Sequence, residues 1–301
     1  MVSYSVCVSK IGASHMQTGK PLQDSAGVLS GAANSIFAVA DGHGSDPHFR
    51  SQVGSRIAVE VAQTAWQRFW ACYLKSQNEG YGKLNMEETI SNIEKVMIWN
   101  WKHRVRNHFK NNPLSNEEFL LAERLNIPWD LLQKTDDFVT SITNASSKDI
   151  KDFPYETFYG TTLLTGICIP NKLWIVMQIG DGQILLKQSG REEIISPVPD
   201  DPEQGFGFTK SLCSSTAIED FRHAYGNESL DFLCACTDGV QDSYAPDDLK
   251  RFVQDIDENI QMFGQDATQK ELEELFPLIS EKGSRDDVSI AGLFYRNERE
   301  V

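Results

Sequence analysis

Apolar residues follow two different spacings along the chain, which predict strands in some segments and helices in others. Strict alternation or a short apolar run, typical of a strand, occurs at residues 2–9, 26–29, 35–40, 159–169, 173–179, 183–187, 193–195, 210–214, 232–236 and 288–295. Apolar residues three or four positions apart, typical of a helix, occur at residues 50–75, 87–110, 246–262 and 267–282. Short turns separate most consecutive strands. We therefore predict an α+β fold in which helices cover antiparallel sheets.

Residues 111–157 follow neither spacing. This stretch is polar and contains the turn-forming sequences Asn-Asn-Pro, Asn-Ile-Pro and Thr-Asn-Ala-Ser-Ser. We expect short helices within it, around residues 117–125 and 131–142. We interpret the stretch as an insertion in a single domain that spans residues 1–301, and not as a second domain.

The chain has 301 residues, with 28 Lys and Arg against 43 Asp and Glu, and its formal net charge is −15. This excess of acids argues against a nucleic-acid partner, because binding to a phosphate backbone needs a basic surface. No apolar run in the sequence is long enough to span a membrane, and no basic segment followed by an apolar one marks a signal peptide. We expect a cytoplasmic monomer that does not bind membranes.

Several common catalytic motifs are missing from the sequence. It contains no P-loop, no His-Glu-x-x-His zinc motif and no Gly-x-Ser-x-Gly nucleophile elbow. Its six cysteines form no Cys-x-x-Cys pair, so we expect reduced, buried thiols. None of them is followed six residues later by the arginine with which cysteine phosphatases hold phosphate. The corresponding classes of enzyme are therefore excluded.

Four aspartates lie where a predicted strand begins or ends, beside a glycine or another turn residue. They are Asp24, Asp41, Asp238 and Asp286. A single Asp-Gly sequence is typical of an ordinary turn. Four carboxylates brought together would repel one another strongly, and bound divalent cations would relieve that repulsion. Because all the ligands are oxygens, the group favours hard ions such as Mg²⁺ or Mn²⁺.

The order of four short motifs matches a known enzyme family. The motifs are Asp41-Gly-His-Gly after an apolar strand, Gly160-Thr-Thr at the start of another, Thr237-Asp-Gly, and Ser284-Arg-Asp-Asp near the C-terminus. With these motifs, from Gly12 to Tyr295, the chain resembles the metal-dependent Ser/Thr protein phosphatases of the 2C type (the PPM family). The segment from Ser14 through Gly19 to Gln23 and Asp24 resembles most closely their compact bacterial branch. The resemblance implies a four-layer α-β-β-α sandwich, with two central antiparallel sheets between outer helices.

The resemblance also implies a set of metal ligands. Asp24, Asp41 and the carbonyl of Gly42 match the ligands of one Mn²⁺ or Mg²⁺ ion. Asp41, Asp238 and Asp286 match the ligands of a second ion, so that Asp41 would bridge the two.

The reaction that the resemblance implies is the hydrolysis of phosphoserine and phosphothreonine in proteins. A water held between the two ions, with its pKa lowered, would attack phosphorus. His43 matches the general acid that protonates the leaving serine or threonine oxygen. The expected partners are phosphorylated proteins in signalling, including a Ser/Thr kinase or its targets.

The sequence departs from the family pattern at Gly19, Gln23, Thr157 and residues 180–183. Gly19 stands where relatives commonly have an arginine that grips the phosphate, and the neighbouring Lys20 could supply only a point charge there. Gln23 replaces a glutamate. In many relatives two aspartates contribute to the site of a third ion. Asp242 stands at one of these positions and Thr157 at the other, so the sequence does not decide whether a third ion binds. We interpret Asp181, in a Gly-Asp-Gly-Gln turn, as structural.

Two other functions stay open at this point. The first is a catalytically weak, phosphatase-like protein that binds and regulates a partner, which the uncharged Gly19 and Gln23 and the polar insertion would favour. The second is a metal-dependent hydrolase that acts on a small phosphorylated metabolite. The sequence does not identify the substrate, because these sites recognise the phosphate itself.

Overall fold

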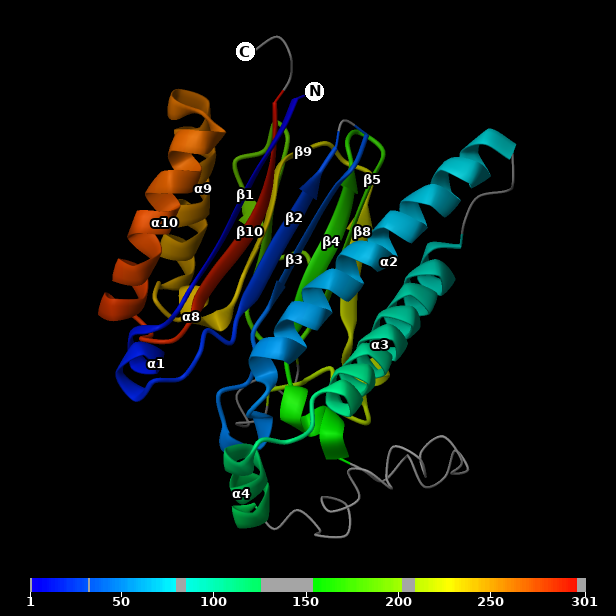
Figure 1. Ribbon diagram of the computed structural model, residues 1–301. Coiled ribbons are helices and arrows are strands. Elements are labelled where there is room, and N and C mark those ends of the chain that lie inside the picture. Colours follow the sequence, from blue (N-terminus) through cyan, green and yellow to red (C-terminus); the bar gives the residue numbers. More distant parts are fainter. Residues whose placement is uncertain (1, 32, 80–84, 126–153, 202–208, 297–301) are drawn as a thin grey trace.

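Ten described strands form two five-stranded antiparallel sheets that lie face to face (Figure 1). The computed structural model describes residues 2–31, 33–79, 85–125, 154–201 and 209–296. The first sheet has the order β1 (Val2–Lys10), β10 (Val288–Arg296), β9 (Leu230–Cys236), β6 (Gln183–Gln188) and β7 (Ile194–Ile195). The second has the order β2 (Ser25–Ser30), β3 (Ser35–Ala40), β4 (Leu163–Ile169), β5 (Leu173–Ile179) and β8 (Arg222–Gly226).

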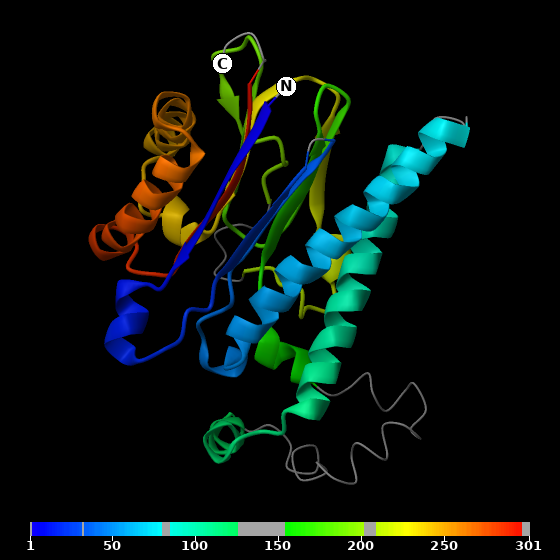
Figure 2. The same cartoon turned by 45° about the horizontal axis from the view of Figure 1, so that its top comes forward.

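Two pairs of long helices cover the outer faces of the sheets (Figures 1 and 2). Helices α9 (Pro246–Phe263) and α10 (Gln265–Lys282) cover the first sheet, and α2 (Ser51–Glu79) and α3 (Met86–Asn111) cover the second. The shorter helices are α1 (Ala13–Thr18), α4 (Asn116–Arg124), α7 (Ala217–Asp220), α8 (Asp238–Gln241), η1 (Asp46–His48) and η2 (Pro154–Tyr159). The predicted α-β-β-α sandwich is therefore confirmed.

Strand β3 shows why the central strands are apolar along their whole length. Ile36, Ala38 and Ala40 pack in the cluster that joins the second sheet to α2 and α3. Phe37 and Val39, which point the other way, pack in the cluster between the two sheets. Since successive side chains of a strand point to opposite faces, a strand covered on both sides must be apolar at every position.

Most predicted strands and the four long helices are confirmed within a few residues, but one predicted strand is wrong, and one strand and the short helices α1, α7, α8, η1 and η2 were missed. Residues 210–214 form turns and not a strand, and the Ser211 hydroxyl donates to the carbonyl of Thr161 at 3.1 Å. Strand β8 was missed because Arg222–Gly226 is polar, as suits the edge of a sheet. In the insertion, α4 confirms the first expected helix, whereas residues 131–142 lie outside the described part of the chain.

All six cysteines have free thiols. Cys168, Cys234 and Cys236 are buried, as expected, but Cys72 is exposed. Burial raises the pKa of Cys236 to about 12, so this thiol stays protonated and unreactive. Among the described helices, none combines the length and the apolar character that crossing a membrane requires.

Candidate metal centre

The edge of the sandwich where β3 ends carries two of the predicted ligands. Ser25 pairs with Ala40 at the ends of β2 and β3, so Asp24 and Asp41 leave the sheet side by side. Asp24 is buried, and Asp41 is half-buried. The hairpin between β2 and β3 therefore fixes this pair.

The facing sheet brings the other two aspartates to the same edge. Strands β9 and β10 are antiparallel neighbours, so Asp238, which follows β9, lies near Asp286, which precedes β10. The Thr237 hydroxyl donates to Oδ2 of Asp24 at 2.8 Å, which ties the two sheets together at this edge.

Three carboxyl groups form the centre of the group. Asp41, Asp238 and Asp181 each offer an oxygen, and the three oxygens lie within 4.8 Å of one another. Asp24 and Asp286 are near enough for their charges to raise the pKa of Asp41. Asp286 lies at the rim, with its side chain 56% exposed. All four predicted aspartates thus come together.

The Gly160-Thr-Thr motif holds the backbone of Asp41. The backbone N–H of Asp41 donates to the Thr162 hydroxyl at 3.0 Å. Its carbonyl accepts from the Thr161 hydroxyl at 2.7 Å and from the backbone N–H of Thr162 at 2.9 Å. Three hydrogen bonds therefore fix the position of this aspartate, which explains why the motif accompanies it.

Two glycines let backbone segments approach closely beside the carboxylates. A Cβ atom on Gly42 would lie 2.5 Å from the carbonyl oxygen of Gln23 and 2.8 Å from that of Ser51. A Cβ atom on Gly239 would overlap the carbonyl oxygen of Asp287. The glycine of each Asp-Gly sequence is therefore required by packing.

The group cannot keep all its charges without cations. Burial, with the charges of its neighbours, raises the pKa of Asp24 and of Asp41 well above the usual range. Burial first, and then the charges of Asp181 and Asp286, raise the pKa of Asp238 to about 7. Among the described residues, the only basic side chain in ion-pair contact with the group is His15. A cluster of acceptor-only oxygens fits Mg²⁺ or Mn²⁺.

Asp181 is a candidate ligand that the sequence interpretation missed. Its Oδ2 accepts from the Thr209 hydroxyl at 2.9 Å, while its Oδ1 is buried without a described hydrogen-bond partner. Gly180 and Gly182 have φ angles of 93° and 84°, so the turn between β5 and β6 places Asp181 at the sheet edge. The two glycines on either side of Asp181 were the sequence signal for this tight turn at the sheet edge.

A second buried network lies behind Asp286. Oδ1 of Asp287 accepts from the backbone N–H of Gly12 at 2.6 Å and lies 2.9 Å from Nδ1 of His15. Its Oδ2 accepts from the backbone N–H of Gln23 at 2.6 Å. Nε2 of His15 then lies 3.6 Å from Asp286 Oδ1, so this buried histidine joins Asp287 to the predicted ligand.

His43 lies on the loop after Asp41, as predicted, and its ring packs on a second histidine. The ring centroids of His43 and His48 are 4.8 Å apart. Burial, with a smaller contribution from His48, lowers the pKa of His43 to about 4. Gly160 leaves room for both rings, since a Cβ atom there would lie 2.5 Å from His48 Nδ1. His43 is therefore neutral at pH 7 in the free chain.

The remaining predicted residues lie around the rim. Nζ of Lys20 donates to the carbonyl of Gly44 at 2.6 Å, which places its charge beside the His43 loop. Asp242 lies at the surface, and its partial burial, together with the charges of Asp181 and Asp286, raises its pKa. The carbonyl of Thr157 accepts from His48 Nδ1, so this residue supports the histidine pair.

Comparisons with known proteins agree with this geometry. A model of the family described as protein phosphatase 2C matches residues 11–276. No match was found among the curated proteins. The serine/threonine phosphatase Stp1 from Staphylococcus aureus is a structural neighbour, with 15% identity and a TM-score of 0.54, covering 99% of this chain and 96% of its own. The serine/threonine phosphatase PstP/Ppp from Mycobacterium tuberculosis has 14% identity and a TM-score of 0.51, and the match covers 99% of this chain and 100% of that one.

A third neighbour, a bacterial serine phosphatase, has 13% identity and a TM-score of 0.53, and the match covers 98% of this chain and 98% of that one. At such identities the neighbours show a shared fold. The family match shows more, because it spans most of the chain and all but the last of the four motifs. The chain therefore belongs to the protein phosphatase 2C family.

Proposed function

We propose that the chain hydrolyses phosphoserine and phosphothreonine in proteins, with Mn²⁺ or Mg²⁺ bound at the aspartate group. The observation that carries this proposal is the meeting of Asp41 and Asp238, which come from different sheets, with no lysine or arginine among the described residues in ion-pair contact with them. When bound, the ions supply Lewis-acid activation of water and of the phosphoryl group.

We assign the metal ligands to the residues that converge on this edge. Asp41, the carbonyl of Gly42 and Asp24 would hold one ion, and Asp41, Asp238 and Asp286 would hold the second. Asp242, at the exposed rim, would be a ligand of a third ion. Asp181 lies nearer to the centre of the group, beside Asp41 and Asp238.

His43 would donate the proton to the leaving serine or threonine oxygen. In the free chain this histidine is neutral at pH 7. A phosphate dianion bound beside the ring would favour the imidazolium form and raise the pKa. Lys20, whose ammonium group lies at the Gly44 carbonyl of the same loop, would attract that dianion.

The test is hydrolysis of a phosphothreonine peptide with and without Mn²⁺. We expect turnover only with the metal, and a loss of at least about 100-fold in Asp238→Asn. Asp255→Asn, which changes an exposed aspartate of α9, is the matched control. Metal-independent turnover, or an active Asp238→Asn variant, would contradict the proposal. In crystals soaked in Mn²⁺, two anomalous-scattering peaks about 4 Å apart and in contact with Asp41 would support the ligand set.

We also propose that residues 1–301 form one phosphatase domain, in which the insertion at 111–157 influences the choice of protein substrate. The first part of the insertion is packed on the domain, because Arg50 binds the Asn112 carbonyl at 2.8 Å and both oxygens of Glu118. Deleting residues 126–153 leaves these contacts in place. This deletion should change turnover of phosphopeptides more than turnover of p-nitrophenyl phosphate, and equal losses would argue against the role.

A catalytically weak regulator is the second proposal, and Gln23 favours it. This side chain is buried, its Nε2 donates to the Ser51 hydroxyl at 2.7 Å, and it brings no charge to the site. Partner binding that persists in Asp238→Asn, with negligible turnover by the parent chain, would favour this function. Action on a kinase or its targets, a monomeric state and a cytoplasmic location stay predictions from the sequence.

A further inference from the structure

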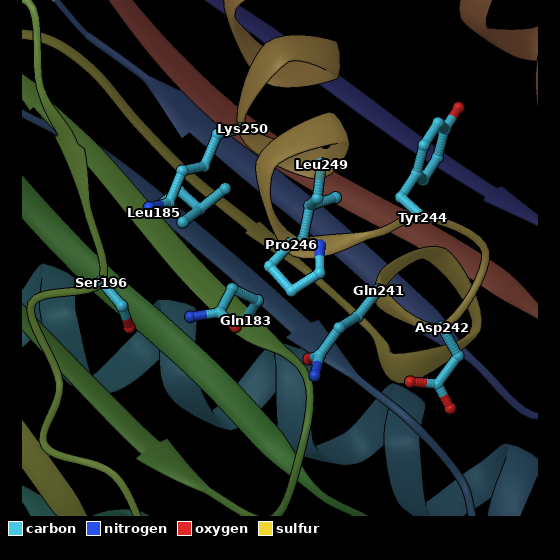
Figure 3. A pocket seen from close by; sticks show the side chains of 9 residues that line it. All are labelled: Gln183, Leu185, Ser196, Gln241, Asp242, Tyr244, Pro246, Leu249 and Lys250. Atoms are coloured by element: carbon cyan, nitrogen blue, oxygen red, sulfur yellow. The ribbon is translucent and has the colours of Figure 1, made fainter.

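A cavity of about 510 Å³ lies between the start of β6 and helices α8 and α9, with Asp242 in its wall (Figure 3). Its wall contains apolar side chains below a polar rim. The residues that line it are Gln183, Leu185, Ser196, Gln241, Asp242, Tyr244, Pro246, Leu249 and Lys250. Its volume lies in the range of sites that bind drug-sized ligands.

The cavity shares Asp242 with the rim of the proposed metal centre and is built on two of the turns that carry its ligands. Gln183 follows Asp181 by two residues, beyond the turn that ends at Gly182. Asp242 ends helix α8, whose first residue is Asp238, and its backbone N–H donates to the Asp238 carbonyl at 2.6 Å. The two turns that carry Asp181 and Asp238 therefore also form one end of the cavity.

The lining side chains specify what would bind. Leu185 and Leu249 are buried and form an apolar surface. Oε1 of Gln241 is buried and has no described hydrogen-bond partner, so it is available to accept from a ligand N–H. Lys250 makes no ion pair with the described residues and lies opposite Asp242 in Figure 3. An extended peptide with an apolar side chain and a carboxylate matches these features.

We propose that this cavity receives the part of the protein substrate that flanks the phosphorylated serine or threonine, and that it selects an apolar residue next to the phosphoresidue and an acidic residue beyond it. The inference rests on the proposed phosphatase function, since the phosphate would lie at the aspartate group. The apolar side chain would contact Leu185 and Leu249, a peptide N–H would donate to Gln241, and the carboxylate would pair with Lys250.

The test compares two sets of phosphothreonine peptides. In the first set, Leu stands next to the phosphothreonine and Glu beyond it, on the N-terminal side in one peptide and on the C-terminal side in another. In the second set, Ser and Lys replace Leu and Glu at the same positions. The quantity measured is kcat/KM for each peptide divided by kcat/KM for p-nitrophenyl phosphate, which is too small to fill the cavity. We expect the parent chain to prefer the Leu and Glu peptide at least fivefold on one side.

Two variants address the two parts of the cavity. Lys250→Glu reverses the charge at the rim, and Ser196→Trp fills the mouth, where Ser196 is exposed. Each should lower the ratio for the preferred peptide about fivefold or more. Lys172→Glu makes the same charge change in the exposed β4–β5 turn and should leave the ratio unchanged.

A parent chain without preference, or variants that keep the parent's preference, would overturn the inference. A chain that hydrolyses no phosphoester would contradict the proposed phosphatase function instead. In that case, fluorescence anisotropy of the labelled Leu and Glu peptide still decides the role of the cavity. Weaker binding to Lys250→Glu than to Lys172→Glu would support it, and equal binding would overturn it.

Discussion

At the scale of single residues, the site depends on side chains that stand behind the predicted ligands. Asp287 is buried and its carboxylate accepts four hydrogen bonds, of which the ring of His15 supplies one. The other nitrogen of that ring faces Asp286. His15 is therefore a positioning residue, because an orienting partner behind a ligand tunes the affinity for the metal.

His15→Ala should raise the Mn²⁺ concentration for half-maximal activity at least tenfold and lower the free energy of unfolding by about 1–3 kcal/mol. The cause is the lost hydrogen bond to Asp287 and the less restrained Asp286. Metal titration and urea unfolding measure the two effects. His15→Asn can restore the hydrogen bond to Asp287 but not the contact with Asp286, so it should recover stability better than metal affinity. The control is His103→Ala, which changes an exposed histidine. An unchanged Mn²⁺ requirement would show that His15 is only structural.

Asp181 allows a test that separates a ligand from a structural hydrogen bond. Asp181→Asn should raise the Mn²⁺ requirement about tenfold or more, because it removes a charge from the centre of the group. Thr209→Val removes only the hydrogen bond to Oδ2 and should change the requirement less than about twofold. Equal effects of the two substitutions, measured by metal titration, would favour the structural role given to Asp181 by the sequence.

At the scale of elements, Arg50 joins the start of α2 to the ends of the insertion. Its guanidinium group pairs with Glu118 at 2.7 and 2.8 Å and donates to the Tyr159 hydroxyl at 3.0 Å. Arg50 is 5% exposed and Glu118 is half-buried, and the Arg50 side chain also holds η2 beside His48. The histidine pair thus depends on the anchoring of the insertion.

Arg50→Met should lower the free energy of unfolding by about 2–4 kcal/mol, because it leaves Glu118 partly buried without its partner. Arg104→Met is the matched control, since Arg104 pairs with Glu60 at 2.9 Å on the surface and should contribute less than about 1 kcal/mol. Urea unfolding of both variants makes the comparison. Similar small losses would mean that Arg50 does not anchor the insertion.

At the scale of the whole molecule, the aspartate group makes stability depend on pH and on metal. The pKa values of Asp24, Asp41 and Asp238 are raised in the folded chain, to about 7 for Asp238. Between the unfolded and the folded pKa, the folded chain binds more protons, so stability falls as pH rises through the folded values. The lowered pKa of His43 acts in the opposite sense, but only below about pH 6.5.

The metal-free chain should therefore lose about 1–3 kcal/mol of unfolding free energy between pH 6.5 and pH 8. Urea unfolding in EDTA measures this change, and Asp238→Asn should make it smaller. Mg²⁺ should stabilise the parent chain more at pH 8 than at pH 6.5, because the ion binds deprotonated carboxylates. A metal-free chain whose stability rises over this range would contradict the charge repulsion inferred at the site.

The sequence alone determined most strands and long helices and the strand-end positions of the four aspartates, for physical reasons that act locally, whereas the sandwich came from the resemblance to the family. Strands such as β3 are apolar at every position because both their faces are covered, and the helices show their buried side as a spacing of three or four residues. The Asp-Gly sequences marked strand ends because close backbone packing requires the glycine.

Only the tertiary structure decided which polar residues meet. Strand β8 was missed because an exposed edge strand need not be apolar, and residues 210–214 showed strand spacing but form turns. Asp181 lies beside Asp41 and Asp238 because the two sheets face each other, and His15 reaches Asp287 from helix α1. No local spacing in the sequence encodes either contact. The sequence carries the short-range pattern of burial, whereas the convergence of charges at one edge depends on how the sheets pack face to face.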